Sequence, residues 1–362
     1  MSRVATITTI ADTILHTGAT SKTTSSSSPS EAQDIGAEKP ELSVIVISWN
    51  TKALLRRCLG SVGKFLASVM HEVLVVDNAS HDGSPDMVSE EFPHVRLVRN
   101  SENLGFGRAT NQAMAAANGE FFLLLNSDTE LLDSGIKRLL DRIRALPDVG
   151  VAGLRILYPD GRVQASARRF PTLRRICVAG FWVNRLLPRP VTEDLLLGHY
   201  WDHCAEREAD WVIGACMLVR SEVFRETGGF DPSIFLYGEE VEWCHRIREC
   251  GWKVLFSPVG SILHLDHQST KQLLGDGGRM SYCLIAEDAL IARWQGLLAA
   301  ALVPPARIGA ALLRMGVFGL RGWLGYDDEY GREVRSEARS VLRHYRRRRR
   351  GEVSWTPRPS TV

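Results

Sequence analysis

The sequence predicts an α/β fold, with a mostly parallel sheet covered by helices on both faces and a helical amphipathic extension at the C-terminal end. Short apolar runs alternate with helical patterns through roughly the first 150 residues, and the links between them are short. Parallel strands need crossover connections, so this alternation is typical of a doubly covered parallel sheet. From Ile285 onward the apolar residues recur at helical spacing without a strand pattern.

The segment before the first strand has a different character. About 40 residues are rich in Ser and Thr, and we expect residues 1–40 to be disordered because they cannot bury enough apolar surface. Polar residues break the stretch 4–15, which argues against a secretory signal. The longest apolar run, 297–303, stops at Pro304 and is shorter than a membrane span of about 20 residues. The seven cysteines contain no Cys-x-x-Cys pair and fit free thiols of a reducing compartment, so we expect a cytoplasmic protein.

The expected elements follow one another in a regular order. Residues 42–48 form a β-branched run typical of a strand buried on both faces, and a helical pattern follows over 54–66. The first half continues with strands at 73–76, 95–98 and 121–125 and helices at 87–92, 105–118 and 136–146. The second half is less regular, with strands expected at 151–157, 211–219 and 253–256 and a helix at 239–250. Residues 171–208 have mixed character and receive no assignment.

Polar side chains follow the strands of the predicted sheet. They are Asn50, Asp77, Asn78, Asn126, Ser127 and Asp128. Ligands of open α/β sheets bind beyond the carboxyl ends of the strands, so these residues mark a candidate site.

Asp128 follows a strongly apolar strand, where a carboxylate is costly unless it is solvated, paired or bound to metal. One interpretation is a hard divalent cation, Mg²⁺ or Mn²⁺, that bridges Asp128 to a diphosphate. The other is a turn that caps the helix beginning near Ser134. Asp77 carries the same ambiguity: it either hydrogen-bonds a nucleobase or ribose, or it forms an ordinary turn.

Glycines at the start of a helix allow backbone N–H groups to approach a phosphate. Asn103, Gly105 and Gly107 have this position after the third strand. A dinucleotide fingerprint would follow the first strand and carry a third glycine, where Thr110 stands here. The pattern therefore fits a dehydrogenase poorly.

Three carboxylates gather at the start of the helix expected at 239–250. Glu239, Glu240 and Glu242 could supply a general base for an acceptor hydroxyl, or they could form an ordinary acidic helix N-terminus. Tyr237 just before them favours a sugar pocket. Farther along, His264 could bind a metal and His267 a phosphate, although either could be an ordinary surface histidine.

The order of these motifs resembles the family-2 inverting glycosyltransferases with a GT-A fold, in particular the rhamnosyltransferase-like branch. The matching segments are residues 43–50, 73–84, 92–111, 120–128, 211–220, 228–246 and 264–269. Each motif is weak singly, whereas seven in one order are specific.

The resemblance implies a hexosyltransferase of cell-envelope polysaccharide synthesis. Its donor would be a nucleoside-diphosphate sugar, dTDP- or UDP-linked, with rhamnose as the candidate sugar. Its acceptor would be a glycan or a polyprenyl-diphosphate-linked sugar, and a divalent metal, Mg²⁺ or Mn²⁺, would be its cofactor.

The resemblance also implies a role for each matching residue. The expected nucleotide-sugar ligands are Asn50, Asp77, Asn78, Asn103, Gly105, Asn111, Asn126 and Ser127. Asp128 and His264 would bind the metal. Glu240 would be the catalytic base, supported by Glu239 and Glu242. The acceptor and sugar pocket would contain Trp211, Gly214, Ala215 and Tyr237.

Two motifs depart from the family pattern. The usual Asp-x-Asp reads Asn126-Ser127-Asp128, and the usual Glu-Asp-x-Asp reads Glu-Glu-Val-Glu at 239–242. The second departure leaves Glu239 as a rival to Glu240. Together they leave open an alternative function, a catalytically inactive sugar-nucleotide-binding or scaffold protein. A nucleotidyltransferase of related fold fits less well, because no glycine-rich loop bearing Arg or Lys follows the first strand.

Four segments are therefore expected: the N-terminal 1–40, a GT-A domain at 41–282, a helical extension at 283–345 and a basic disordered tail at 346–362. Within the GT-A domain, 41–150 would bind the nucleotide and 151–282 the acceptor. Arg307, Arg314 and Arg321 recur every seven residues and would share one helical face. With the Arg346–Arg350 run, this face suggests a peripheral protein on anionic lipid of the inner membrane face. A packing helix with a solvated tail is the alternative, and no aromatic-basic interleaving supports nucleic acid.

Overall fold

The computed structural model describes residues 39–265, 278–326 and 328–352. The expected disorder of residues 1–40 therefore falls almost entirely outside the described residues, as do His267 and the end of the expected basic tail. From Lys39 onward the chain forms one compact unit.

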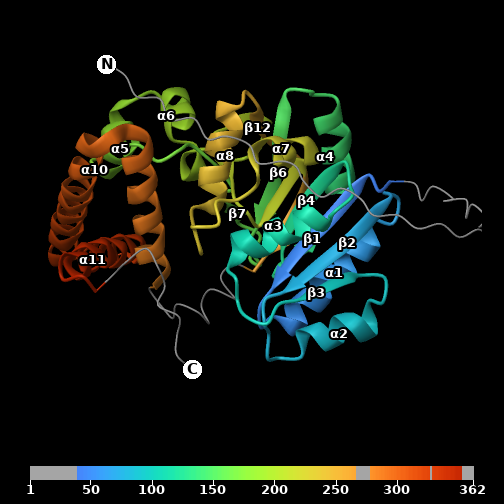
Figure 1. The fold of residues 1–362 in the computed structure, drawn as a ribbon. Helices are drawn as coiled ribbons and strands as arrows, with labels where there is room; N and C mark the ends of the chain where they lie inside the picture. The colour runs from blue at the N-terminus through green and yellow to red at the C-terminus, as the bar shows by residue number, and fades with distance from the viewer. Residues whose placement is uncertain (1–38, 266–277, 327, 353–362) are drawn as a thin grey trace, which may run out of the picture. The chain divides into compact units, whose positions relative to one another are not determined.

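A large mixed sheet is the centre of this unit (Figure 1). Its parallel part contains β1 (Leu42–Ser48), β2 (His71–Asp77), β3 (Arg96–Arg99) and β4 (Phe121–Asn126). β1 lies between β2 and β4, and β3 pairs with the outer edge of β2, all in parallel. The predicted mostly parallel sheet is confirmed in this half of the chain.

The other half of the sheet mixes strand directions. β11 (Cys216–Arg220) inserts antiparallel between β4 and β6 (Val149–Leu157). β12 (Lys253–His264) runs parallel to β6 and antiparallel to β5 (Thr129–Leu131). Short strands β7 (Val163–Gln164) and β9 (Arg207–Ala209) pair with β6 and β12. The pairing of β5 with β12 brings the turn after β4 beside the end of β12.

Helices cover both faces of the sheet, as the sequence predicts. Those of the first half are α1 (Lys52–Phe65), α2 (Ser84–Glu91), α3 (Phe106–Ala116) and α4 (Gly135–Arg144). The second half adds α7 (Ser221–Thr227) and α8 (Glu239–Glu249). In β4, Leu123 joins the hydrophobic cluster that includes α1 and α4, whereas Leu124 joins the cluster with α3 and α8. The apolar strand residues are therefore buried on both faces.

Residues 171–208, which the sequence leaves unassigned, form short helical elements. They are α5 (Leu173–Gly180), η1 (Val183–Leu186), α6 (Arg189–Leu196) and η2 (Gly198–Tyr200). Just before them, β8 (Ala167–Arg168) pairs with β10 (Trp211–Val212) in a separate two-stranded sheet.

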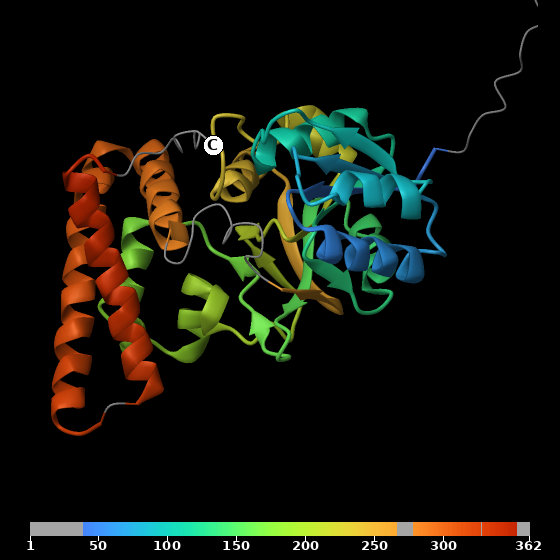
Figure 2. The ribbon, with the colours of Figure 1, turned by 90° about the horizontal axis from the view of Figure 1, so that it is seen from below.

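Two long helices, α10 (Gly278–Trp323) and α11 (Glu329–Arg349), complete the chain and lie side by side (Figures 1 and 2). Gly296 breaks α10, with φ 79° and ψ −178°. α10 begins before the expected boundary at 283, and the helix continues through Pro304 and Pro305, which follow the apolar run at 297–303. α11 continues through Arg349, so most of the Arg346–Arg350 run is helical and not the disordered segment that we expected.

Arg307 and Arg314 do not lie on the exposed basic face that the sequence suggests, whereas Arg321 is 44% exposed and pairs with Asp328 at 3.2 Å. Arg307 is 11% exposed in its side chain and binds Glu287 at 2.5 Å. Arg314 donates to the Ala179 carbonyl at 3.2 Å. The second half of α10 also exposes apolar side chains, many of them three or four residues apart. By length and composition alone, the part of α10 between Arg279 and Trp323 could cross a membrane, and 22% of its most apolar window is buried.

Candidate active site

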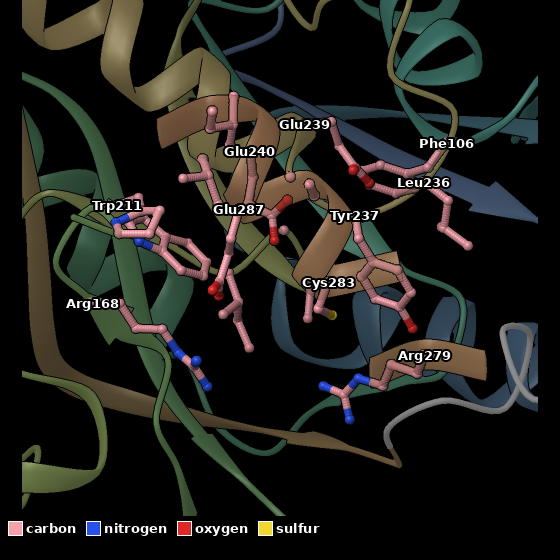
Figure 3. A pocket seen from close by; sticks show the side chains of 18 of the residues that line it. Phe106, Arg168, Trp211, Leu236, Tyr237, Glu239, Glu240, Arg279, Cys283 and Glu287 are labelled. Carbon is pink, nitrogen blue, oxygen red and sulfur yellow. The ribbon is translucent and has the colours of Figure 1, made fainter. Parts of the chain in front are cut away.

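A cavity of about 890 Å³ opens at the carboxyl ends of the parallel strands. One side is lined by the polar turns after β1, β2 and β4, and the other by residues of β8, η2, the start of α8 and the first turns of α10. Figure 3 shows the part around α8. The cavity lies where the polar residues after the strands led us to expect a site.

The cavity contains most of the residues that the sequence singles out. Those that line it are Asn78, Asn103, Gly105, Asn126, Ser127, Asp128, Trp211, Gly214, Ala215, Tyr237, Glu239, Glu240 and His264. Four others, Asn50, Asp77, Asn111 and Glu242, do not belong to its lining.

The end of the cavity where we expect the nucleotide lies at the end of β2. Asp77 is buried, and its Oδ2 accepts a hydrogen bond from the Ser80 backbone at 2.9 Å. Its Oδ1 has no partner in the described structure, so it keeps a free acceptor just behind the lining. Asn78 donates to the Gly105 carbonyl at 3.2 Å. Gly105 has φ 83°, and a Cβ there would lie 2.7 Å from the Phe235 carbonyl oxygen, so only glycine fits this turn.

Asn50 and Asn111 are committed to the fold. Asn50 accepts a hydrogen bond from the His81 backbone at 2.8 Å, which ties the turn after β1 to the loop after β2. Both ends of the Asn111 amide bind the backbone of Phe230, at 2.8 and 2.9 Å. The nucleotide-binding roles expected for these two side chains remain predictions. The observed contacts of Asn111 join α3 to the loop before α8.

Asp128 and His264 meet because β5 and β12 pair in register at Thr129 and His264. His264 Nε2 lies 3.4 Å from Asp128 Oδ1, and both side chains are 7% exposed. On its other side, His264 Nδ1 lies 3.0 Å from Gln164 Oε1. The Gln164 amide nitrogen donates to the His264 carbonyl at 3.0 Å, which fixes the amide orientation and makes Nδ1 the donor to Oε1.

The Asp128–His264 pair has the chemistry of a cation site. In neutral His264 the lone pair of Nε2 faces a carboxylate oxygen, so two acceptors confront each other and a cation or a proton is needed between them. A carboxylate and an imidazole oriented by a second hydrogen bond suit a divalent metal. No group of three or more His, Cys, Asp or Glu that could hold a metal occurs among the described residues, so further ligands would have to come from a bound diphosphate or water.

The acidic cluster begins α8 directly after Gly238, which has φ 91°. Glu239 is 5% exposed, and its Oε2 has no partner in the described part of the chain. Burial, followed by repulsion from Glu240, raises the pKa of Glu239 well above its ordinary value. Gly107 of α3 packs near Glu239, because a Cβ added to Gly107 would lie 3.9 Å from the Glu239 Cβ.

Glu240 points into the cavity between Trp211 and Tyr237, whereas Glu239 turns toward Phe106 (Figure 3). Burial raises the pKa of Glu240, while backbone hydrogen bonds, including those of Gly214 and Gly238, and the charge of Arg168 oppose this rise. A carboxylate with a raised pKa that faces open space is suited to accept a proton.

Glu242, unlike Glu239 and Glu240, is paired with arginines. It is 1% exposed and accepts hydrogen bonds from Arg246, the closest at 2.8 Å. Arg293 of α10 lies 3.5 Å away. Glu242 therefore holds α8 and α10 together, and any support for catalysis would act through that packing.

Sequence reasoning missed the part of the cavity wall that comes from β8, the region of η2 and the start of α10. Arg168, Leu197, Tyr200, Arg279 and Cys283 line it, and none belongs to a periodic pattern or a motif. The arginine pair at 168 and 169 beside a short apolar segment was the only local signal.

Comparisons with known proteins give consistent results. The family model described as Glycosyl transferase family 2 matches residues 43–228. The chain is 31% identical over 244 residues to the N-acetylglucosaminyl-diphospho-decaprenol L-rhamnosyltransferase of Mycobacterium tuberculosis, covering 63% of this chain and 77% of that protein. It is 30% identical over 240 residues to the O-antigen biosynthesis protein RfbC of Myxococcus xanthus, covering 64% of this chain and 18% of that protein.

A solved structure is similar along most of the chain. It is the mannosyltransferase PcManGT of Pyrobaculum calidifontis in complex with GDP-Man and Mn²⁺, with a TM-score of 0.53, 18% identity and coverage of 88% of this chain and 89% of that one. This likeness confirms the GT-A type of fold.

Replacing Glu239 by Gln tests the burial of its carboxyl group. A raised pKa means that the folded state favours the protonated form, so wild type loses stability as pH rises from the ordinary Glu range through the raised pKa. We expect Glu239→Gln to match wild type near pH 4 and to be more stable near pH 8, by about 1.4 kcal/mol for each unit of pKa elevation. Thermal unfolding across this range measures the difference.

The exposed Glu222 of α7 provides the control. Glu222→Gln should follow wild type at every pH. A Glu239→Gln advantage that is the same at pH 4 and pH 8 would contradict the burial of an ionisable carboxyl group.

Proposed function

The chain belongs to glycosyl transferase family 2, and on that basis we propose that it moves a sugar from a nucleoside diphosphate to a hydroxyl of a lipid-linked sugar, with inversion at the anomeric carbon. It is a glycosyltransferase of cell-surface glycan synthesis. The M. tuberculosis relative is named for rhamnose transfer to a diphospho-decaprenol sugar. That name supports rhamnose as the donor sugar, a dTDP- or UDP-linked donor and a polyprenyl-diphosphate-linked acceptor.

One observation carries the proposal: the same cavity contains the Asp128–His264 pair and the pocket-facing Glu240. Residues 41–150 would bind the donor nucleotide, with Asp77 and Asn78 near the base and ribose. Residues 151–282 and the first turns of α10 would bind the acceptor. Nothing observed favours the catalytically inactive alternative.

Asp128 and His264 would hold a divalent cation, Mg²⁺ or Mn²⁺. When bound, such a cation supplies positive charge that stabilises the departing nucleoside diphosphate. Gln164 would keep Nε2 of His264 free for this purpose through its hydrogen bond at Nδ1.

Glu240 would be the general base. The acceptor hydroxyl oxygen attacks the anomeric carbon while its proton passes to a Glu240 carboxylate oxygen. The bond from that carbon to the diphosphate oxygen breaks, and the electron pair leaves with the nucleoside diphosphate. Trp211 and Tyr237 on either side of Glu240 would hold the reacting sugars.

Glu240→Gln tests the base. We expect transfer to fall by about 10²- to 10⁴-fold while donor affinity stays within twofold, because the amide cannot take the proton. Since burial raises the pKa of Glu240, activity of wild type should decline, as pH falls, at a pH above the ordinary titration range of Glu. Steady-state transfer assays on a panel of sugar nucleotides measure both effects. If Glu239→Gln abolishes transfer and Glu240→Gln retains it, Glu239 is the base.

Asp128→Ala tests the metal site. Loss of the carboxylate should remove the metal-dependent part of donor affinity and leave the metal-independent part, because Asp77 and Asn78 remain. Calorimetry of nucleoside diphosphate binding with and without Mn²⁺ measures this. Asp141→Ala, which removes an exposed carboxylate paired with Lys137 on α4, is the matched control. Equal metal dependence in Asp128→Ala and wild type would disprove this assignment.

The localisation that we propose is cytoplasmic, with peripheral attachment to the inner face of the membrane. The second half of α10 exposes an apolar stripe that contains Leu298, Leu302, Leu312, Leu320 and Trp323. Trp323 is 82% exposed, a costly state in water unless the surface is covered. The arginines at the end of α11 would add attraction to anionic headgroups. Exposed apolar residues accompanied by positive charge fit an anionic bilayer surface.

A double variant, Leu312→Glu with Leu320→Glu, tests this attachment. Wild type should sediment with vesicles that contain phosphatidylglycerol, and the variant should lose most of that binding because it places two charges in the stripe. Met70→Glu, at a 47% exposed apolar residue next to β2, is the control and should bind as wild type does. Absence of wild-type sedimentation, or equal sedimentation of wild type and the double variant, would rule the attachment out.

A further inference from the structure

Arg168 lies in the cavity wall opposite the nucleotide end, and its position is fixed by several contacts. As part of β8 it pairs with Trp211, and it also forms an isolated bridge with Leu197. Its Nε donates to the Ala165 carbonyl at 2.8 Å, and its guanidinium carbon lies 5.6 Å from the Trp211 ring centroid. The terminal nitrogens make no hydrogen bond to a described residue, so they remain available on a side chain that is otherwise held in place.

Two arginines close to Arg168 in the sequence are paired with carboxylates. Arg169 and Arg175 each contact the buried Asp210 at 3.1 Å, and Arg169 also contacts Asp194 at 2.8 Å. Arg169 and Arg175 also line the cavity, but their guanidinium groups are held by these carboxylates. Arg168 forms no ion pair with a carboxylate in the described residues, and this distinguishes it from both neighbours.

In the absence of a ligand, the positive charge of Arg168 is destabilised by its surroundings. Burial lowers the pKa of the Arg168 guanidinium, and the positive charge of Arg279 acts in the same direction. The carboxylates of Glu287 and Glu240 oppose the shift without reaching ion-pair distance. Glu287 is itself bound by Arg307 at 2.5 Å. The electrostatic interaction with an incoming anion is therefore stronger for this partly desolvated guanidinium, which has no close counterion, than for a solvated one.

Arg279 of α10 faces Arg168 across the cavity. Figure 3 shows the two guanidinium groups reaching from opposite sides toward the same open space below Glu240. The Arg279 guanidinium lies 6.0 Å from the Tyr237 ring centroid. Guanidinium groups bind phosphate oxygens in pairs, so two of them around one space suit two linked phosphates.

We propose that Arg168, with Arg279 opposite it, forms a second diphosphate subsite that binds the diphosphate of the lipid-linked acceptor and places the acceptor sugar beside Glu240. The inference rests on the proposed function, because that acceptor carries a diphosphate close to its sugar. The subsite is separate from the Asp128–His264 pair, which would face the diphosphate of the donor. Arg168 is a positioning residue in this scheme, since it touches the acceptor away from the reacting hydroxyl.

Calorimetry with farnesyl diphosphate as the probe tests the subsite. The full chain is first saturated with UDP or dTDP and Mn²⁺, so that the donor diphosphate position is filled. We expect Arg168→Gln to weaken binding of farnesyl diphosphate by about 10-fold or more. Arg168→Lys should weaken it less, because it keeps the charge but loses the planar fork. Arg162→Gln, at a 78% exposed arginine paired with Asp160, is the control for loss of one charge and should bind as wild type does.

Transfer assays provide the second readout. With a diphosphate-linked acceptor, Arg168→Gln should raise the acceptor KM by about 10-fold and leave kcat within about twofold. With an uncharged alkyl glycoside of the same sugar, the variant should equal wild type.

The outcomes distinguish binding of the acceptor diphosphate from binding of the donor nucleoside diphosphate. Undiminished farnesyl diphosphate binding by Arg168→Gln overturns the subsite, as does an equal KM rise with both acceptors. A loss of UDP or dTDP affinity in the variant assigns Arg168 to the donor site instead and also overturns the proposal. If wild type transfers no sugar from any donor yet binds farnesyl diphosphate through Arg168, the proposed function fails while the diphosphate subsite stands.

Discussion

The packing of α10 against the start of α8 is the contact on which the rest of the site depends. A Cβ on Gly238 would lie 2.9 Å from the Ala286 Cβ, so only glycine allows α10 this close to the first turn of α8. Farther along, the rings of His245 and Trp294 stack at 4.1 Å. This contact removes water from the acidic turn, and the resulting desolvation raises the pKa of Glu239 and Glu240. The helix that completes the cavity thus also prepares the carboxylates for proton transfer.

Two groups of ionisable side chains differ in how they are paired: one is buried beside arginines, and the other, buried or half-buried, lines the cavity. Asp210, Glu242 and Asp288 each have arginine partners, and each joins separate parts of the chain: Asp288 of α10, for example, contacts Arg348 of α11 at 2.5 Å. Glu239, Glu240 and Arg168 line the cavity without an ion-pair partner among the described residues. Keeping a buried charge unpaired costs stability, so its concentration at one cavity indicates that ligands complete these interactions.

The sequence predicts those features that depend on local patterns. The strands at 42–48, 73–76 and 121–125 and the polar residues after them were predictable, because doubly buried strands carry continuous apolar runs. The insertion of β11 between β4 and β6 was not, since strand order depends on pairing between distant segments. Asn111 resembles a nucleotide ligand in sequence, yet it binds the backbone of Phe230, 119 residues away. The sequence could not place Arg168 in the cavity wall for the same reason: its position depends on Trp211 and Leu197.

The break at Gly296 divides α10 into two segments with different surroundings. Before the break, Arg279, Cys283 and Glu287 line the cavity. After it, the exposed surface is apolar, beginning with Leu297, which is 88% exposed. The residues between Arg279 and Gly296 span about 25 Å as a helix, so a single element connects the acceptor end of the cavity to the proposed membrane face. An acceptor anchored in a bilayer must present its sugar at a fixed height above the surface. Two helical segments joined at Gly296, one lining the acceptor pocket and one on the proposed membrane face, would set that height. Such a connection would couple the position of the diphosphate to membrane attachment.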